Sequence, residues 1–191
     1  GLQFGRTIAA KALGIDVAGI TINRYCASGL ESIAMATAKI RTGMAECIIA
    51  GGTESMSMVP TAGWKTVPAY SITKDEPDYY LSMGLTAEAV AKEFNVNRTE
   101  QDEFATTSHA KAKTAIENGY FKEGILPITV NQTYVNEKGK RAVKSYIVDT
   151  DEGVRADTTV EGLAKLKPAF AQTGSVTAGN SSQTSDGRSE E

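Results

Sequence analysis

Apolar residues in the first quarter of the chain alternate between helical and extended spacing. Residues 1–14 repeat with the period of a helix and end in a glycine, whereas the short β-branched run 17–22 is typical of a buried strand. The alanine-rich, proline-free segment from about 27 to 41 again has helical spacing, and the nearly continuous apolar run 46–52 predicts a second buried strand. Helices alternating with strands indicate a layered α/β fold.

The pattern changes at residue 59. Residues 59–82 carry prolines and aromatic residues without a regular period, which predicts a long irregular segment with a functional or packing role. The remaining segments regain regular patterns, which predict helices over residues 86–94, 101–118 and 159–166, and a hairpin of residues 125–130 and 143–148 around the turn 136–140. A capping-box pattern at residues 99–102 marks the start of the second of these helices.

Composition excludes several classes of protein. The 191 residues include 41% apolar residues, enough for the core of one or two modest domains. A net charge of −3 gives no electrostatic reason to expect nucleic acid as a partner, and no apolar run reaches the roughly 20 residues that membrane insertion requires. Two cysteines make no disulfide framework, which favours a reducing, cytoplasmic location. The acidic run 149–152 is interpreted as solvated surface, so we expect no metal site.

Cys26 has the sequence context of a nucleophile. It lies between the predicted strand 17–22 and the predicted helix 27–41. The first amide N–H groups of a helix have no partner within the helix and carry partial positive charge, so they favour a thiolate and can hold a developing oxyanion. The small residues that follow would let a substrate carbonyl approach the backbone. The alternative is that Cys26 is a small buried apolar residue.

The sequence around Cys26 resembles that of a known protein family. The run Cys26-Ala27-Ser28-Gly29-Leu30, continued by Ala50-Gly51-Gly52-Thr53-Glu54-Ser55-Met56-Ser57-Met58, resembles the nucleophile block of thiolases, the acetyl-CoA C-acyltransferases. The likeness extends nearly to Gly187. It implies an α/β fold, a thiolase-type layered α/β/α half-domain with an inserted α+β loop domain, and it makes Cys26 the expected catalytic nucleophile.

The resemblance also implies a division of the chain. Residues 1–58 would form part of the thiolase core, residues 59–174 the inserted loop domain, and residues 175–187 the return to the core. Residues 188–191 do not continue the family pattern and are interpreted as a foreign tail. Because the sequence opens in mid-helix without a methionine, we expect a truncated N-terminal half.

Three further residues are expected to bind coenzyme A, by the same resemblance. Arg155 would lie beside the adenine nucleotide, Met83 beside the acyl pocket and Ser182 near the pantetheine. A guanidinium can stack on adenine and neutralise phosphate, which supports the role of Arg155 independently. The alternative is an ordinary surface arginine. Coenzyme A would be a substrate, and we expect no permanently bound cofactor.

The implied reaction transfers an acyl group between coenzyme A thioesters through an acyl-thioester on Cys26, either by 3-ketoacyl-CoA thiolysis or by the reverse Claisen condensation. The family places its histidine, its asparagine–water pair and its second cysteine in motifs that this sequence lacks. We interpret His109 as a residue on the surface of its helix or in helix packing, and Cys47 as a core residue in a strand. We therefore expect the isolated chain to have little or no thiolase activity.

Several functional alternatives stay open at this point. Biosynthetic acetoacetyl-CoA thiolases carry a histidine directly before the methionine at the Met83 position, whereas this chain has Ser82, which favours a 3-ketoacyl-CoA thiolase of fatty acid metabolism. A non-catalytic module that binds coenzyme A, lipid or a protein partner is an alternative of another class. A relative of ketoacyl synthases is disfavoured by the motif wording. Family members form dimers or tetramers, so a homo-oligomer is expected of the full-length protein.

Overall fold

The computed structural model describes residues 3–60, 63 and 65–190. The chain divides into two compact units. The first comprises the described residues of Gly1–Thr66 together with those of Thr184–Glu191, and the second comprises Val67–Gln183. Each unit is described by itself.

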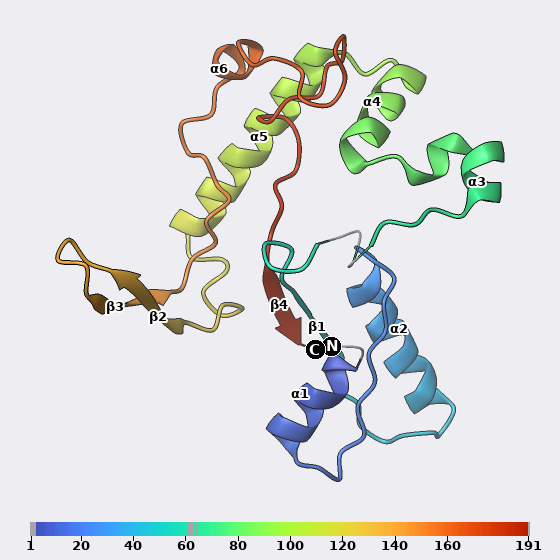
Figure 1. Cartoon of the computed structure of the whole chain (residues 1–191), viewed down its shortest axis with the longest axis vertical. Helices are drawn as coiled ribbons and strands as arrows, with labels where there is room; N and C mark the ends of the chain where they lie inside the picture. Colours follow the sequence, from blue (N-terminus) through green and yellow to red (C-terminus); the bar gives the residue numbers. More distant parts are fainter. Residues whose placement is uncertain (1–2, 61–62, 64, 191) are drawn as a thin grey trace. The chain divides into compact units, whose positions relative to one another are not determined.

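The first unit combines two helices with one pair of strands. Its elements are α1 (Phe4–Leu13), α2 (Ser28–Arg41), β1 (Gly51–Glu54) and β4 (Gly187–Glu190). The two helices confirm those expected over residues 1–14 and about 27–41. Strands β1 and β4 lie side by side and antiparallel, with Gly51 opposite Glu190 and Glu54 opposite Gly187 (Figure 1). Residues 188–190, interpreted from the sequence as part of a foreign tail, thus supply the backbone partner of β1.

The run 17–22, expected to be a strand, is not one. It lies against helix α1, where the Gly5 amide donates a hydrogen bond to Thr21 Oγ1 at 2.8 Å. The contact needs glycine on both sides, because a Cβ on Gly19 would lie 2.6 Å from Arg6 Cα and one on Gly5 would lie 2.5 Å from Ile20 O. β-branched residues favour extended backbone, but a strand also needs a hydrogen-bonding neighbour. Here residues 17–22 lie against the side of helix α1 and not beside another strand.

The second expected strand is shifted along the chain. Of the run 46–52, only its last two residues belong to β1, which continues to Glu54. Cys47 lies outside any strand and is exposed, so the prediction of a core position was wrong. The apolar run has strong β propensity, but the backbone of β4 pairs only with residues 51–54. Position in a strand is set by the partner, not by the run itself.

The apolar stripes of helices α1 and α2 are mostly exposed. Leu13 on α1 is 50% exposed and Leu30 on α2 is 74% exposed. Among the described residues of this unit, Ala36 and Ala50 are the buried hydrophobic ones. Hydrophobic periodicity therefore predicted the helices correctly without predicting burial.

The second unit has more helix than strand. Its elements are α3 (Tyr70–Asp75), a 3₁₀ helix (Pro77–Tyr80), α4 (Met83–Glu93), α5 (Arg98–Glu117), β2 (Ile128–Val135), β3 (Arg141–Val148) and α6 (Val160–Ala164). Helices α4, α5 and α6 confirm the three expected helices, and β2 with β3 confirms the hairpin. Helices α5 and α6 pack together.

Part of the stretch expected to be irregular is helical. Helix α3 and the 3₁₀ helix lie within residues 59–82, and Pro77 occupies the first turn of the 3₁₀ helix. The rings of Tyr79 and Tyr80 meet edge to face at 5.1 Å, and the Tyr80 hydroxyl accepts a hydrogen bond from the Ala69 amide at 3.3 Å. These contacts between aromatic residues and backbone stabilise short turns that hydrophobic periodicity does not reveal.

Helix α5 begins three residues earlier than expected. Asn97 Oδ1 accepts from the Glu100 amide at 3.1 Å, and the Asn97 amide donates to Glu100 Oε2 at 2.8 Å. This reciprocal pair is a complete capping box. The sequence pattern places the capping box at residues 99–102, but Thr99 lies inside the helix. The N-cap falls on the residue whose backbone is extended, and that residue is Asn97.

The hairpin is built around a tight turn. Ile128 lies opposite Val148 and Val135 opposite Arg141. At the turn, Asn136 Oδ1 accepts hydrogen bonds from the amides of Lys138 and Lys140, both at 3.0 Å. Among the described helices and strands, β2 and β3 contact only one another. The hairpin is therefore held by its own ladder and turn.

The buried centre of the second unit is polar as well as apolar. Asp102 is 1% exposed and Thr177 is fully buried. Asp102 accepts hydrogen bonds from Arg98 Nε at 2.8 Å and from Asn180 Nδ2 at 2.9 Å, and the Thr177 amide donates to Asn180 Oδ1 at 2.7 Å. The network joins α5 to the segment around residue 180, so each buried polar group has a partner. No helix in the described part of the chain has the length and apolar character to cross a membrane.

Candidate active site

Cys26 lies in a tight turn just before helix α2. The Ala27 amide donates to Arg24 O at 3.1 Å and the Ser28 amide donates to Tyr25 O at 3.0 Å, which brings the chain round into the helix. The cysteine is exposed. It is therefore not the buried apolar residue of the alternative interpretation. It lies just before a helix, as expected from the sequence, but the strand expected before it is not formed.

The start of helix α2 has no side-chain cap. Its N-cap residue is Ala27, which has no side-chain oxygen to accept from the first amides. A Cβ on Gly29 would meet nothing within 4 Å, so the space beside the first turn is open. An uncapped helix start leaves donors and partial positive charge for an anionic group. The first turn of α2, next to Cys26, is therefore open to such a group.

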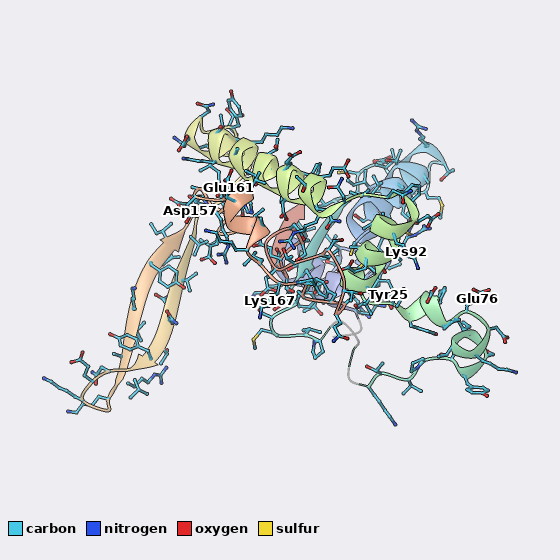
Figure 2. All side chains as sticks on the ribbon, turned by 90° about the horizontal axis from the view of Figure 1, so that it is seen from above. Tyr25, Glu76, Lys92, Asp157, Glu161 and Lys167 are labelled. Atoms are coloured by element: carbon cyan, nitrogen blue, oxygen red, sulfur yellow. The ribbon has the colours of Figure 1, made fainter. Side chains whose placement is uncertain are left out.

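The residue before the cysteine has an unusual backbone. Tyr25, labelled in Figure 2, has a φ of 49°, in the left-handed region that non-glycine residues seldom adopt. Its amide donates to Asn23 Oδ1 at 2.9 Å. Ser28 Oγ accepts from the Arg24 amide and donates to Tyr25 O, both at 2.7 Å. Sequence analysis missed these supporting residues, although Asn and Ser flanking a short turn are a recognisable signal.

Met83 lies at the start of helix α4, and the residue is 71% exposed. The next residue, Gly84, contacts the ring of Phe170, and the ring leaves no room for a Cβ at that position. Met83 is thus held where helix α4 meets the segment after α6.

Arg155 has a fixed backbone and an exposed side chain. Its amide donates to His109 Nδ1 at 3.2 Å, and its carbonyl accepts from Thr158 Oγ1 at 2.8 Å. His109 lies in helix α5 and is half-buried, as expected of a residue in helix packing. The guanidinium remains available to solvent.

Ser182 is exposed, and its hydroxyl donates to Gln183 O at 3.3 Å. The Gln183 side chain lies directly on Gly153. The segments that carry Arg155 and Ser182 therefore meet in the second unit. Cys26 belongs to the first unit, whereas Met83, Arg155 and Ser182 belong to the second.

A carboxylate that sequence analysis missed organises the same unit. Glu88 on α4 accepts hydrogen bonds from the Ser175 amide at 3.0 Å and from the Val176 amide at 2.9 Å. The Glu88 side chain also occupies the space where a Cβ on Gly174 would lie. The sequence feature that could have indicated this contact is Gly174 directly before Ser175. In the described residues, no group of three or more His, Cys, Asp or Glu side chains is placed to hold a metal ion.

The helices and strands of the chain define an α/β protein with an exposed cysteine just before helix α2, and comparison with known proteins gives the family. The model of the thiolase N-terminal domain matches residues 3–190, so the chain belongs to the thiolase family. This confirms the expected family and the α/β thiolase-type fold class.

Three individual thiolases show how similar the chain is to members of the family. The chain is 50% identical over 188 residues to the 3-ketoacyl-CoA thiolase of Bacillus subtilis, covering 98% of this chain and 48% of that protein. It is 44% identical over 167 residues to the peroxisomal 3-ketoacyl-CoA thiolase A of Rattus norvegicus, covering 87% of this chain and 38% of that protein. The dimeric peroxisomal thiolase of Saccharomyces cerevisiae matches with a TM-score of 0.77 at 34% identity, covering 95% of this chain and 45% of that one. The chain spans about half the length of these relatives or less.

Proposed function

We propose that this chain carries the nucleophile of a 3-ketoacyl-CoA thiolase and that Cys26 is the acyl carrier. The observation that supports this most directly is the exposed cysteine before the uncapped start of α2. The similarity to 3-ketoacyl-CoA thiolases supports the substrate class. The other cysteine is less suitable, since Cys47 precedes no helix.

The proposed reaction has two steps. The Cys26 thiolate attacks the 3-keto carbon of a 3-ketoacyl-CoA, the C2–C3 bond breaks, and acetyl-CoA leaves after C2 takes a proton from a general acid. The acyl group is then a thioester on Cys26. The thiolate of free coenzyme A attacks this thioester and releases Cys26. Sulfur suits both steps because it is a good nucleophile and a fair leaving group. Amide donors at the start of α2 would stabilise the oxyanion in each step.

Coenzyme A would be bound by the second unit. We propose that Arg155 contacts the adenine nucleotide, that Ser182 lies near the pantetheine and that Met83 borders the acyl pocket. The contact between Gln183 and Gly153 supports a common role for the first two residues. The exposed side chains of all three support access by a ligand. In this proposal, residues 59–174 are the inserted loop domain, and residues 1–58 and 175–187 belong to the core.

The test is the reactivity of the two cysteines. We expect iodoacetamide to alkylate Cys26 faster than Cys47, as measured by mass spectrometry of peptides from the 191-residue chain. Because both cysteines are exposed, a difference in rate reports reactivity rather than burial. In the full-length protein, incubation with acetoacetyl-CoA should add an acetyl group to Cys26 and none to Cys26→Ser, with Cys47→Ser as the matched control. Equal alkylation rates without acylation would contradict the proposal.

The same acylation experiment tests which length of acyl chain the enzyme prefers. We propose a preference for 3-ketoacyl groups longer than acetoacetyl, because Ser82 stands before Met83. Loading of Cys26 from a medium-chain 3-ketoacyl-CoA should then exceed loading from acetoacetyl-CoA at equal concentration. The reverse order would favour a biosynthetic acetoacetyl-CoA thiolase. We also propose that the full-length protein forms a homo-oligomer and is cytoplasmic, which sedimentation of that protein and fractionation of its cells would test.

A further inference from the structure

Ser28 makes two hydrogen bonds that point away from its own helix. It is the first residue of α2, and its Oγ accepts from the Arg24 amide and donates to Tyr25 O, both at 2.7 Å. One hydroxyl therefore bonds the backbone on each side of the Arg24–Tyr25 peptide unit. Two residues, Cys26 and Ala27, lie between this peptide unit and the first residue of the helix.

The turn needs such support because Tyr25 is left-handed. A non-glycine residue at a φ of 49° is disfavoured by contacts of its Cβ with the backbone. The cost of such a conformation is about 1–3 kcal/mol, so it persists only where the surroundings fix it. Two hydrogen bonds of ordinary strength, each contributing about 1 kcal/mol, are of the right size to do so.

Other contacts at the turn are weaker candidates. The ion pair of Arg24 with Glu31 measures 2.7 Å, but the two side chains are 68% and 34% exposed. Exposed pairs of this kind contribute about 0–1 kcal/mol. Asn23 Oδ1 holds the Tyr25 amide from one side only. Ser28 is the residue in this turn whose side chain bonds on both sides of Tyr25.

We propose that Ser28 is a positioning residue for Cys26: its hydroxyl holds the left-handed Tyr25 turn and so directs the cysteine to the start of α2. This inference depends on the proposed role of Cys26. A serine at a helix start more often caps the helix by accepting from its first amides. Here the serine oxygen is used by the preceding turn, and α2 has no side-chain cap. The turn's own bonds occupy the Ala27 and Ser28 amides, but the serine oxygen does not accept from the later amides of the first turn, those of Gly29 and Leu30, which are left for a thiolate or an oxyanion.

The test compares four proteins in a Cys47→Ser background: the parent, Ser28→Ala, Ser28→Thr and Ser32→Ala. Ser32 is the matched control, because its hydroxyl bonds Gly29 O within the same helix at 2.7 Å and does not contact the turn. The readout is the alkylation rate of Cys26 by iodoacetamide, with helix content followed by circular dichroism. We expect Ser28→Ala to lower the rate about three- to tenfold, the equivalent of about one lost hydrogen bond. Ser28→Thr, which keeps the hydroxyl, should restore it, and Ser32→Ala should leave it unchanged.

The outcomes separate the two proposals. If the parent Cys26 reacts faster than Cys47 does in the unsubstituted chain but Ser28→Ala matches the parent, Ser28 has no positioning role and the proposed function stands. If Ser32→Ala slows alkylation as much as Ser28→Ala, or if Ser28→Thr fails to restore the rate, the effect belongs to helix stability and the inference is wrong. If the parent Cys26 reacts no faster than Cys47, the proposed function itself is contradicted.

Discussion

His109 Nδ1 accepts a hydrogen bond from the backbone amide of Arg155 at 3.2 Å, which joins helix α5 to a segment 46 residues further along the chain. The Arg155 carbonyl is held as well, by the Thr158 hydroxyl at 2.8 Å. The backbone of the proposed nucleotide-binding arginine is therefore fixed while its guanidinium stays exposed. Fixing the backbone lowers the entropic cost of ordering the side chain on a ligand.

Replacing His109 with alanine should weaken coenzyme A binding. The Arg155 amide would lose its acceptor, and a lost hydrogen bond costs about 0.5–1.5 kcal/mol, which corresponds to a roughly two- to tenfold weaker affinity. His109→Gln, which offers a carbonyl oxygen, should recover part of the loss. Titration calorimetry with coenzyme A checks both variants.

Thr107→Ala provides the control for this pair, because Thr107 is an exposed residue on the same helix. It should bind coenzyme A as the parent does. An unchanged affinity of His109→Ala, with Arg155→Ala strongly weakened, would show that the histidine contact has no role in binding.

Removal of the Glu88 carboxylate should destabilise the second unit. This side chain accepts from two backbone amides of the 175–176 segment, at 3.0 and 2.9 Å. Hydrogen bonds to a charged group contribute more than neutral ones, so Glu88→Ala should lower the free energy of unfolding by about 2–4 kcal/mol. Glu88→Gln keeps one acceptor oxygen and should lose less. Urea unfolding followed by circular dichroism measures both.

The matched control is Glu93→Ala, at an exposed position of the same helix. It should change stability by less than about 0.5 kcal/mol, the usual range for surface substitutions. Equal losses for Glu88→Ala and Glu93→Ala would mean that the contact with residues 175–176 contributes nothing.

Stability of the first unit should fall in acid because of Asp186. The Ser57 hydroxyl and the Ser57 amide donate hydrogen bonds to this carboxylate and hold its pKa below the ordinary value. A carboxyl whose pKa is lower in the folded state contributes stability above its unfolded pKa of about 4, and this contribution is lost as the pH falls through the folded pKa. Unfolding free energies measured from about pH 6 down to about pH 3 should show this loss in the parent and less of it in Asp186→Asn.

Ser57→Ala tests the stated cause of the lowered pKa. It removes the hydroxyl donor, so it should also reduce the acid loss. The double variant should lose no more than Asp186→Asn alone, because the two groups act through one contact. Additive effects of Ser57→Ala and Asp186→Asn would contradict this pairing.

Loss of the capping box should destabilise helix α5. Asn97→Ala removes the acceptor of the Glu100 amide, 3.1 Å away, and substitutions of this kind typically cost about 1 kcal/mol. Asn118→Ala, at the other end of the same helix, is the control, since the bonds of the Asn118 backbone amide do not depend on its side chain. Urea unfolding should therefore distinguish the two alanine variants. Equal midpoints for both would mean that the cap is not needed.

Local chemistry explains what could be predicted from the sequence. Helix α2 was expected from its period and composition, and the hairpin from the turn that Asn136 and Gly139 build, with Gly139 at a φ of 69°. The place of Cys26 just before helix α2 agrees with the expectation. Each of these features depends on residues within a few positions of one another. The local residue types alone therefore indicate which backbone conformation is favoured.

Features that depend on distant partners were mispredicted or missed. The run 17–22 was expected to pair as a strand but lies on helix α1, and Cys47 was expected in the core but is exposed. The roles of Glu88 and His109 as acceptors for backbone amides 87 and 46 residues away have no local signature. Secondary-structure propensity indicates which backbone conformation a segment favours. The neighbour that forms hydrogen bonds with its polar groups is known only from the folded chain.

By itself, the sequence determined helices α1, α2, α4, α5 and α6, the hairpin, the family resemblance and the place of Cys26 just before helix α2, because these follow from short-range spacing and residue type. Only the tertiary structure decided that β4 pairs with β1, that Ser28 bonds back into the turn before Cys26, and that Arg155 is tied to helix α5. The physical reason is that a hydrogen bond is specific to the group that lies opposite, and folding alone brings those groups together.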